Sequence, residues 1–170
     1  MENKNNRNTK NYEDFPLSLA FFDALPVLFF SVAMLIIAWN FHNTCFIVGA
    51  VLCTLAGIGK VSWKIIIAGT KKDIVILNRQ LRVLMPVGFL LIIIGLVTGF
   101  SGIHNAGATI SSILSFPAVF FFAVTIIGII MMSVFACKLD GTKLRSNWIE
   151  QITNTIAQGC FLLGVLCVVF

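Results

Sequence analysis

Charged residues are scarce in this chain, and two of the connections between its apolar segments contain none. Only 11% of the 170 residues are Asp, Glu, Lys or Arg, whereas water-soluble domains usually carry about 25%. Hydrophobic residues make up 58% of the chain, and its mean hydropathy is +0.97. This composition excludes a soluble globular protein, and the apolar runs leave no room for a separate soluble catalytic domain.

The chain also lacks the sequence motifs of common catalytic and metal sites. It contains no HExxH, no GxSxG and no glycine-rich phosphate-binding loop. His42 and His104 are its two histidines, and Asp23, Asp73 and Asp140 do not form the clustered carboxylates of a magnesium-dependent lipid phosphotransferase. We therefore expect a protein that is not an enzyme and that holds no metal or cofactor, with a membrane-embedded lipid-modifying enzyme as the minor alternative.

Five cysteines are scattered along the chain, and no pair has the CxxC spacing of a redox or zinc site. Cys45 and Cys167 both fall near the predicted outer face of the membrane, where a disulfide between them is geometrically conceivable. The simpler interpretation is that the cysteines are buried and act as small hydrophobic side chains.

Five apolar runs are each long enough to cross a bilayer, because about 20 helical residues span a hydrocarbon core of about 30 Å. We place these runs at residues 17–39, 44–66, 81–100, 110–137 and 147–170. Pro117 either kinks the fourth run or marks its true start. The runs are continuous rather than alternating, which excludes a β-barrel. The predicted fold is an all-α integral membrane protein, a bundle of five transmembrane helices (residues 17–170) after a polar tail (residues 1–16).

The basic residues predict the orientation of this bundle. All 12 Lys and Arg residues lie before the first run, around the junction of the second and third runs, or between the fourth and fifth. Cytoplasmic loops hold the excess of Lys and Arg, so we predict a cytoplasmic N-terminus and an extracytoplasmic C-terminus in the plasma (inner) membrane. Trp39 falls at the predicted outer boundary, and Trp63 and Trp148 fall at the inner one, where indole rings concentrate. The net charge of +5 then reflects topology and attraction to anionic lipids, not nucleic-acid binding.

Small residues recur at the spacing of helix–helix contacts in lipid. The third run carries Gly88, Gly95 and Gly99, and the second carries Gly49, Ala56 and Gly57. Such residues let two helix backbones approach closely. We expect these faces to meet within one protomer rather than between protomers.

The fifth run is polar in its first half. Asn147, Gln151, Asn154 and Gln158 follow one another at spacings of four, three and four, which places them on one helical face, and Glu150 flanks them. Amides that faced lipid would lack hydrogen-bond partners, so this stripe must face protein or a water-filled cavity.

Charged side chains on the other runs reach matching depths. Asp23 lies about 9 Å inside the first run, and Lys60 lies several ångströms inside the second. An unpaired charge at the membrane centre costs at least about 2.5–3.5 kcal/mol, so we predict that Asp23 pairs with Lys60, and Glu150 with Arg82 or Lys64. The candidate binding residues are Asp23, Lys60, Lys64, Arg79, Arg82, Glu150, Gln151, Asn154 and Gln158.

Two interpretations of these polar groups remain. In the first, they line a pocket open to the cytoplasm, and the protein is a transporter or transporter-like binding protein for a small polar, anionic or lipid-derived solute. In the second, they bond neighbouring helices, and the chain is a non-catalytic subunit or stabilising partner of a larger membrane complex. We prefer the pocket, because interhelical side-chain hydrogen bonds average only about 0.6 kcal/mol. Membrane lipids and either a homo-oligomer or a membrane partner subunit are the expected partners.

Overall fold

The computed structural model describes residues 16–70, 75–100, 106–139 and 143–170. Within these ranges all regular elements are helices: α1 (Leu17–Phe22), α2 (Ala24–Phe41), α3 (Thr44–Thr70), α4 (Val75–Phe100), α5 (Ala106–Leu114), α6 (Ala118–Lys138) and α7 (Leu144–Val169). Residues 1–15 of the predicted polar tail, His104 and Asp140 lie outside the described residues.

Five helical segments are long and apolar enough to cross a membrane, as the sequence predicts. They are Leu17–Phe41 (α1 with α2), Thr44–Ile66 (in α3), Arg82–Gly99 (in α4), Ala118–Lys138 (α6) and Leu144–Val169 (α7). The all-helical prediction and the order of the five runs are therefore confirmed. The connection between the second and third runs is shorter than predicted, because α3 continues to Thr70 and α4 already begins at Val75.

The first long segment is interrupted where α1 ends and α2 begins. Pro26 has no N–H to donate to the carbonyl oxygen of Phe22, which is the last residue of α1. Asp23 lies at the interruption, and its backbone N–H still bonds to the carbonyl oxygen of Leu19 at 3.0 Å. The break is therefore a local disturbance at one residue rather than a loop.

Pro117 marks the start of the fourth long helix, which is one of the two roles that the sequence allows. The short helix α5 ends at Leu114, and α6 begins at Ala118, directly after Pro117. Pro86, by contrast, lies inside an unbroken α4.

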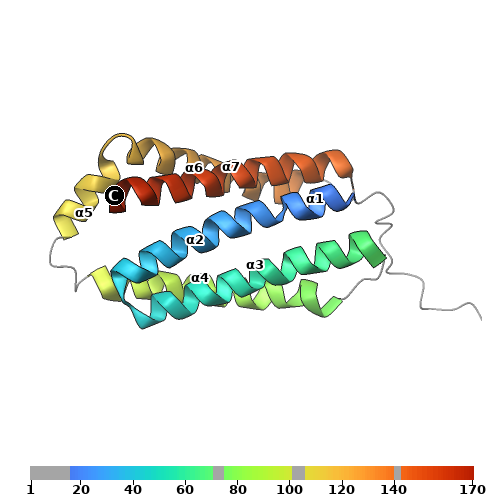
Figure 1. The fold of residues 1–170 in the computed structure, drawn as a ribbon, viewed down its shortest axis with the longest axis horizontal. Coiled ribbons are helices and arrows are strands. Elements are labelled where there is room, and N and C mark those ends of the chain that lie inside the picture. The colour runs from blue at the N-terminus through green and yellow to red at the C-terminus, as the bar shows by residue number, and fades with distance from the viewer. Residues whose placement is uncertain (1–15, 71–74, 101–105, 140–142) are drawn as a thin grey trace, which may run out of the picture.

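The segment formed by α1 and α2 lies between two helical hairpins, α3–α4 and α6–α7 (Figure 1). The two helices of each hairpin pack chiefly against each other, and α2 packs against both α3 and α7. We call the end of the bundle where α1, α4 and α7 begin the charged end, because the Lys and Arg residues of the described segments gather there. We call the other end, with the α2–α3 turn at His42, α5 and the C-terminus, the neutral end.

Glycines bring the backbones of α3 and α4 into close contact. A Cβ atom on Gly49 would lie 2.6 Å from the carbonyl oxygen of Gly88 and 2.7 Å from the backbone nitrogen of Ile92. A Cβ atom on Gly95 would overlap the backbone of Phe46. These contacts join two helices of one chain, so the predicted packing within a protomer is confirmed for these glycines.

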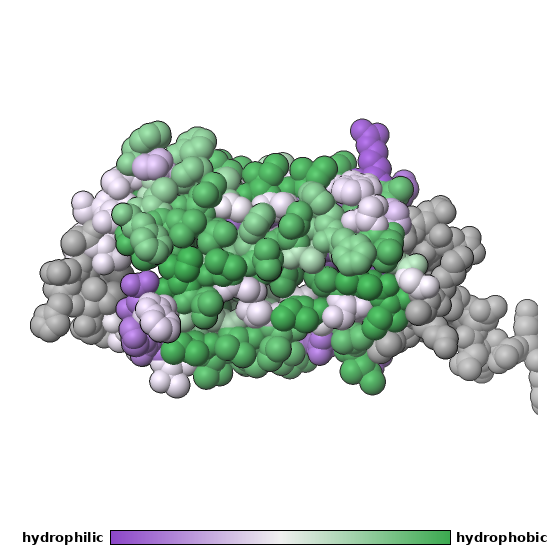
Figure 2. Space-filling model, in the orientation of Figure 1, coloured by the Kyte–Doolittle hydropathy of each residue, from purple (hydrophilic) through white to green (hydrophobic). Residues whose placement is uncertain are grey.

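The surface between the two ends is dominated by apolar side chains, and polar residues gather toward the ends (Figure 2). The main buried cluster is small: Met34, Phe46, Ala50, Cys53 and Ile92. Large hydrophobic side chains on all five long segments are exposed instead, among them Leu35, Val97 and Ile130. An exposed apolar surface of this extent is typical of contact with lipid or with other proteins.

The five cysteines lie in described segments and are free thiols. Cys53 is buried, whereas Cys45, Cys137 and Cys167 are exposed on the surface of the chain. The interpretation of the cysteines as buried hydrophobic side chains is therefore right for Cys53 and wrong for these three, because they lie on the apolar outer faces of their helices.

Candidate functional site

A buried ion pair lies near the charged end. The Nζ atom of Lys64 on α3 lies 2.9 Å from Oδ2 of Asp23, and the two side chains are 8% and 3% exposed. The predicted partner of Asp23, Lys60, is one helical turn away from the residue that makes the contact. The pairing of Asp23 with Lys60 was therefore wrong by one turn, because depths counted along two separate helices are uncertain by about one turn, or about 5.4 Å.

Two further charged residues act on this ion pair. Lys60 and Glu150 both contribute electrostatically at the Lys64 ammonium group, the first by repulsion and the second by attraction. Both side chains are half-buried. Two cationic and two anionic groups thus share this region, so their formal charges balance.

The two arginines of the candidate set do not join this group. Arg79 and Arg82 are exposed on α4, which packs chiefly against α3. Of the two predicted partners of Glu150, Lys64 is the one whose ammonium group the structure places within electrostatic reach of it. Arg79 and Arg82 lie instead on the outside of the charged end.

The polar stripe of α7 is most deeply buried at its start. Asn147 is 8% exposed and Gln151 is 2% exposed, whereas Asn154 and Gln158 are half-buried. The Asn147 side-chain amide donates to the carbonyl oxygen of Lys143 at 3.0 Å. Oε1 of Gln151 accepts no hydrogen bond from any residue that the structure describes. A buried acceptor without a donor costs about 1–3 kcal/mol.

Ring contacts place the start of α7 beside the ion pair. The rings of Phe22 and Trp148 lie with their centroids 5.5 Å apart. Asp23 follows Phe22 directly, and Gln151 lies about one turn beyond Trp148. We call Asp23, Lys60, Lys64, Glu150 and Gln151 the polar cluster.

The faces of α2 and α7 that carry polar groups continue toward the neutral end. Asp23, Phe30 and Ile37 follow one another at intervals of seven residues, as do Asn154 and Phe161, and such intervals keep residues on one helical face. Phe30 and Phe161 stack with their ring centroids 6.4 Å apart. The two faces therefore meet inside the molecule, and the polar stripe of α7 faces protein, which is one of the two surroundings that the sequence allows.

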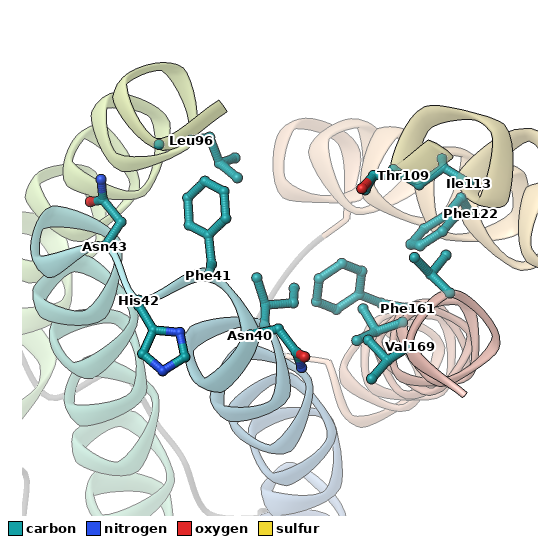
Figure 3. Close-up of a pocket in the computed structure, with 14 residues that line it drawn as sticks. Asn40, Phe41, His42, Asn43, Leu96, Thr109, Ile113, Phe122, Phe161 and Val169 are labelled. Atoms are coloured by element: carbon teal, nitrogen blue, oxygen red, sulfur yellow. The ribbon is translucent and has the colours of Figure 1, made fainter. Parts of the chain in front are cut away.

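A cavity of about 690 Å³ lies at the neutral end (Figure 3). Its lining is mostly apolar: Ile37, Asn40, Phe41, His42, Asn43, Leu96, Gly99, Thr109, Ile113, Phe122, Phe161, Val165, Val168 and Val169. Phe41 and Leu96 lie on one side of it, and Ile113 and Phe122 lie across from them (Figure 3). None of the nine candidate binding residues lines this cavity, and it lies at the end opposite to the predicted cytoplasmic pocket.

Aromatic rings lie on the side of the cavity that faces the polar cluster. The Phe30 ring contacts Phe89 of α4 at 6.5 Å and Phe161 of α7 at 6.4 Å between centroids, and the Phe161 ring contacts Phe122 of α6 at 6.4 Å. These spacings are typical of favourable aromatic pairs. The four rings thus join four helices in one layer, and two of them, Phe122 and Phe161, also line the cavity.

The sequence offers little signal for this cavity. Its walls are Phe, Val, Ile and Leu side chains, which do not differ from ordinary lipid-facing residues in a sequence. The run from Asn40 to Asn43 is the one hint, because it places three polar side chains at a helix end. Asn43 serves partly as a cap, since its Oδ1 atom accepts the backbone N–H of Phe46 at 3.1 Å.

No group of three or more His, Cys, Asp or Glu side chains that could hold a metal ion occurs in the described segments. Comparisons with protein-family models, with curated proteins and with solved structures find no match to this chain.

Proposed function

We propose that this chain is a multi-pass membrane protein that binds and transports a small polar, anionic or lipid-derived solute, with its charged end in the cytoplasm. The observation that carries this proposal is the buried ion pair of Asp23 and Lys64 in an otherwise apolar helical bundle. Ionisable side chains inside a membrane are costly, and they commonly mark the pathways of solutes and ions.

A contribution to stability is a weak reason for this ion pair to exist. Replacing a buried ion pair with well-packed apolar side chains is often neutral, or stabilises a protein by about 1–4 kcal/mol. Gln151 adds to the cost, because its buried Oε1 atom has no donor among the described residues. Costly buried polar side chains that contribute little to stability are typical of a functional site.

Each candidate residue has a role in this proposal. Lys64, assisted by Lys60, would bind the anionic part of the solute, and Asp23 would be the counter-ion that the solute displaces. Gln151, Asn154 and Gln158 would hydrogen-bond the polar remainder. Arg79, Arg82 and Glu150 would determine the electrostatic potential at the charged end, where an excess of positive charge attracts anions.

The interruption between α1 and α2 supports movement at this site. Transporters commonly place a broken helix at the solute site, where the freed backbone groups face a cavity. Here Pro26 removes the hydrogen bond to the Phe22 carbonyl group, next to the Asp23 carboxylate. A small rotation at Asp23 would separate its carboxylate from Lys64 without unfolding α2.

The test is a thermal-stability screen of the purified protein in mild detergent, with inorganic phosphate, glycerol 3-phosphate and phosphoethanolamine as probes. We expect at least one probe to raise Tm in a concentration-dependent way. Lys64→Met should abolish this rise, whereas Lys138→Met, which removes an exposed cation at the end of α6, should preserve it. A probe that binds is then followed by uptake into proteoliposomes.

The rival function is that of a non-catalytic subunit in a larger membrane complex. It predicts that a foreign protein copurifies in stoichiometric amount in mild detergent and is lost from the Lys64→Met variant. A solitary chain whose Tm responds to a probe contradicts this rival. A stoichiometric partner combined with no response to any probe contradicts the proposed transport function.

A further inference from the structure

The cavity at the neutral end is separate from the polar cluster and has a different chemistry. Its volume of about 690 Å³ lies within the range of about 300–1,000 Å³ that is typical of small-molecule sites, which also occur between the helices of bundles. No Lys, Arg, Asp or Glu is among the residues that line it. A ligand that fits this cavity is therefore mostly hydrocarbon.

We infer that the cavity is a binding site for one hydrocarbon chain of a membrane lipid, which enters from the leaflet at the neutral end. This inference rests on the membrane location in the proposed function, but it does not depend on the solute of the polar cluster.

The surroundings of the cavity determine what reaches it. Leu96 of α4 lines the cavity and is 42% exposed, its neighbour Val97 is 70% exposed, and Ile110 of α5 is 44% exposed. In a membrane these side chains contact lipid tails. Lipid chains are therefore the molecules that contact this side of the cavity, and they are present there at the high concentration that they have in a bilayer.

The depth of the cavity fits one leaflet. On α7 the lining extends from Phe161 to Val169, which are separated by eight helical steps or about 12 Å. One leaflet of a hydrocarbon core of about 30 Å is about 15 Å deep. The rings of Phe161 and Phe122 line the cavity and contact each other at its inner end on α7, so we expect an inserted chain to end against them.

The mouth of the cavity suits the uncharged ester group that joins a hydrocarbon chain to the rest of a phospholipid. Asn40, His42 and Asn43 at the end of α2 and Thr109 of α5 are its polar lining residues. Asn40 donates to the carbonyl oxygen of Ile36 at 2.9 Å, so its amide is oriented by its own helix. Amide and hydroxyl groups recognise a hydroxyl or ester group without a charge.

The experiment uses the full chain in proteoliposomes with a phospholipid probe that carries a diazirine at the end of one acyl chain. After illumination, mass spectrometry locates the labelled residues. Two variants test the cavity: Ile113→Trp fills it from α5, and Leu114→Trp adds the same side chain at the next position, which is 66% exposed and does not line the cavity. Val168→Phe is a second filling variant, on α7.

We expect labelling at residues 161–169 that an excess of unlabelled phospholipid competes away. Ile113→Trp and Val168→Phe should reduce this labelling about tenfold, the change that corresponds to about 1.4 kcal/mol of binding, and Leu114→Trp should leave it unchanged. Labelling of the cavity residues that cannot be competed, or that the filling variants do not change, overturns the inference. The inference is also overturned if a copurified protein prevents labelling of the cavity residues, because the occupant would then be a partner helix.

This experiment also separates the two proposals. Lys64→Met should not change the labelling of the cavity, because Lys64 is not among the residues that line it. If the outer faces of α4 and α6 are labelled but the cavity is not, the lipid-chain site fails while the membrane location stands. If neither is labelled, the membrane location and with it the proposed function fail.

Discussion

The ion pair of Asp23 and Lys64 predicts strong energetic coupling between two residues that are 41 positions apart in the sequence. We consider the single substitutions Asp23→Ala and Lys64→Met and the double variant. Each single substitution leaves one buried charge without its partner, and each should cost about 3–5 kcal/mol of unfolding free energy. The double variant leaves no unpaired charge, so it should be much less damaging than the sum of the two.

The expected coupling follows from the geometry. At 2.9 Å and an effective dielectric constant of about 20, the attraction between two unit charges is on the order of 6 kcal/mol. Lys60 and Glu150 act on Lys64 in opposite directions, and the attraction of Glu150 offsets only part of the larger repulsion from Lys60. Part of the attraction is lost as the remaining charge relaxes toward water, and we expect a coupling energy of about 2–3 kcal/mol.

The assay is equilibrium unfolding in mixed micelles, in which the mole fraction of sodium dodecyl sulfate is raised and tryptophan fluorescence is followed. Lys60→Met is the matched control, because it removes the cation one turn away on the same helix. We expect this control to cost less than about 1 kcal/mol, as for a partly exposed charge. Strict additivity of the Asp23 and Lys64 substitutions would refute the ion pair. If Lys60→Met cost more unfolding free energy than Lys64→Met, the pairing of Asp23 with Lys60 that the sequence predicts would be supported instead.

Two further predictions concern packing and orientation. Gly49→Ala should destabilise the α3–α4 hairpin by about 1–3 kcal/mol in the same unfolding assay, because the new Cβ atom would lie 2.6 Å from the Gly88 carbonyl oxygen. The control Gly69→Ala should be neutral or slightly stabilising, because no atom lies within 4 Å of its new Cβ atom. Equal effects of the two substitutions would contradict the close contact. For the orientation, single cysteines replace His42 and Lys143, which are both exposed, in a background without the native cysteines. An impermeant thiol reagent added outside intact cells should label position 42 and not position 143. Labelling of position 143 alone would reverse the orientation that the basic residues predict.

The fold could be predicted from the sequence because each long helix carries its own signal. The length and hydropathy of a run are local properties, and in lipid they determine a helix almost independently of its neighbours. The role of Pro117 was ambiguous because it is not a local property: it depends on whether the preceding residues, Ala106–Leu114, pack as a separate helix. The predicted run begins at residue 81, whereas α4 begins at Val75. The first turns of α4 were missed because Asn78, Arg79 and Gln80 are polar, and a helix can extend beyond its apolar part.

The candidate site was only partly predictable. Residue spacing on α7 identified Gln151 as a buried polar side chain, because helical periodicity within one element is exact enough to define a face. The partner of Asp23 depends on the relative depth of two helices, and an error of one turn, about 5.4 Å, exchanges Lys60 for Lys64. The cavity could not be predicted, since it depends on how far the two hairpins separate at the neutral end.

The contacts of the central segment suggest which part of the molecule can move. Phe30 of α2 contacts rings on both α4 and α7, so the aromatic layer ties α2 to both hairpins. The six residues of α1 precede the break, and the ion pair at Asp23 and the ring contact of Phe22 with Trp148 hold their end against α3 and α7. Leu19 and Ala20 of α1 are also fully buried, and α1 packs against α3, so loss of the ion pair should loosen the break at Asp23 without detaching α1.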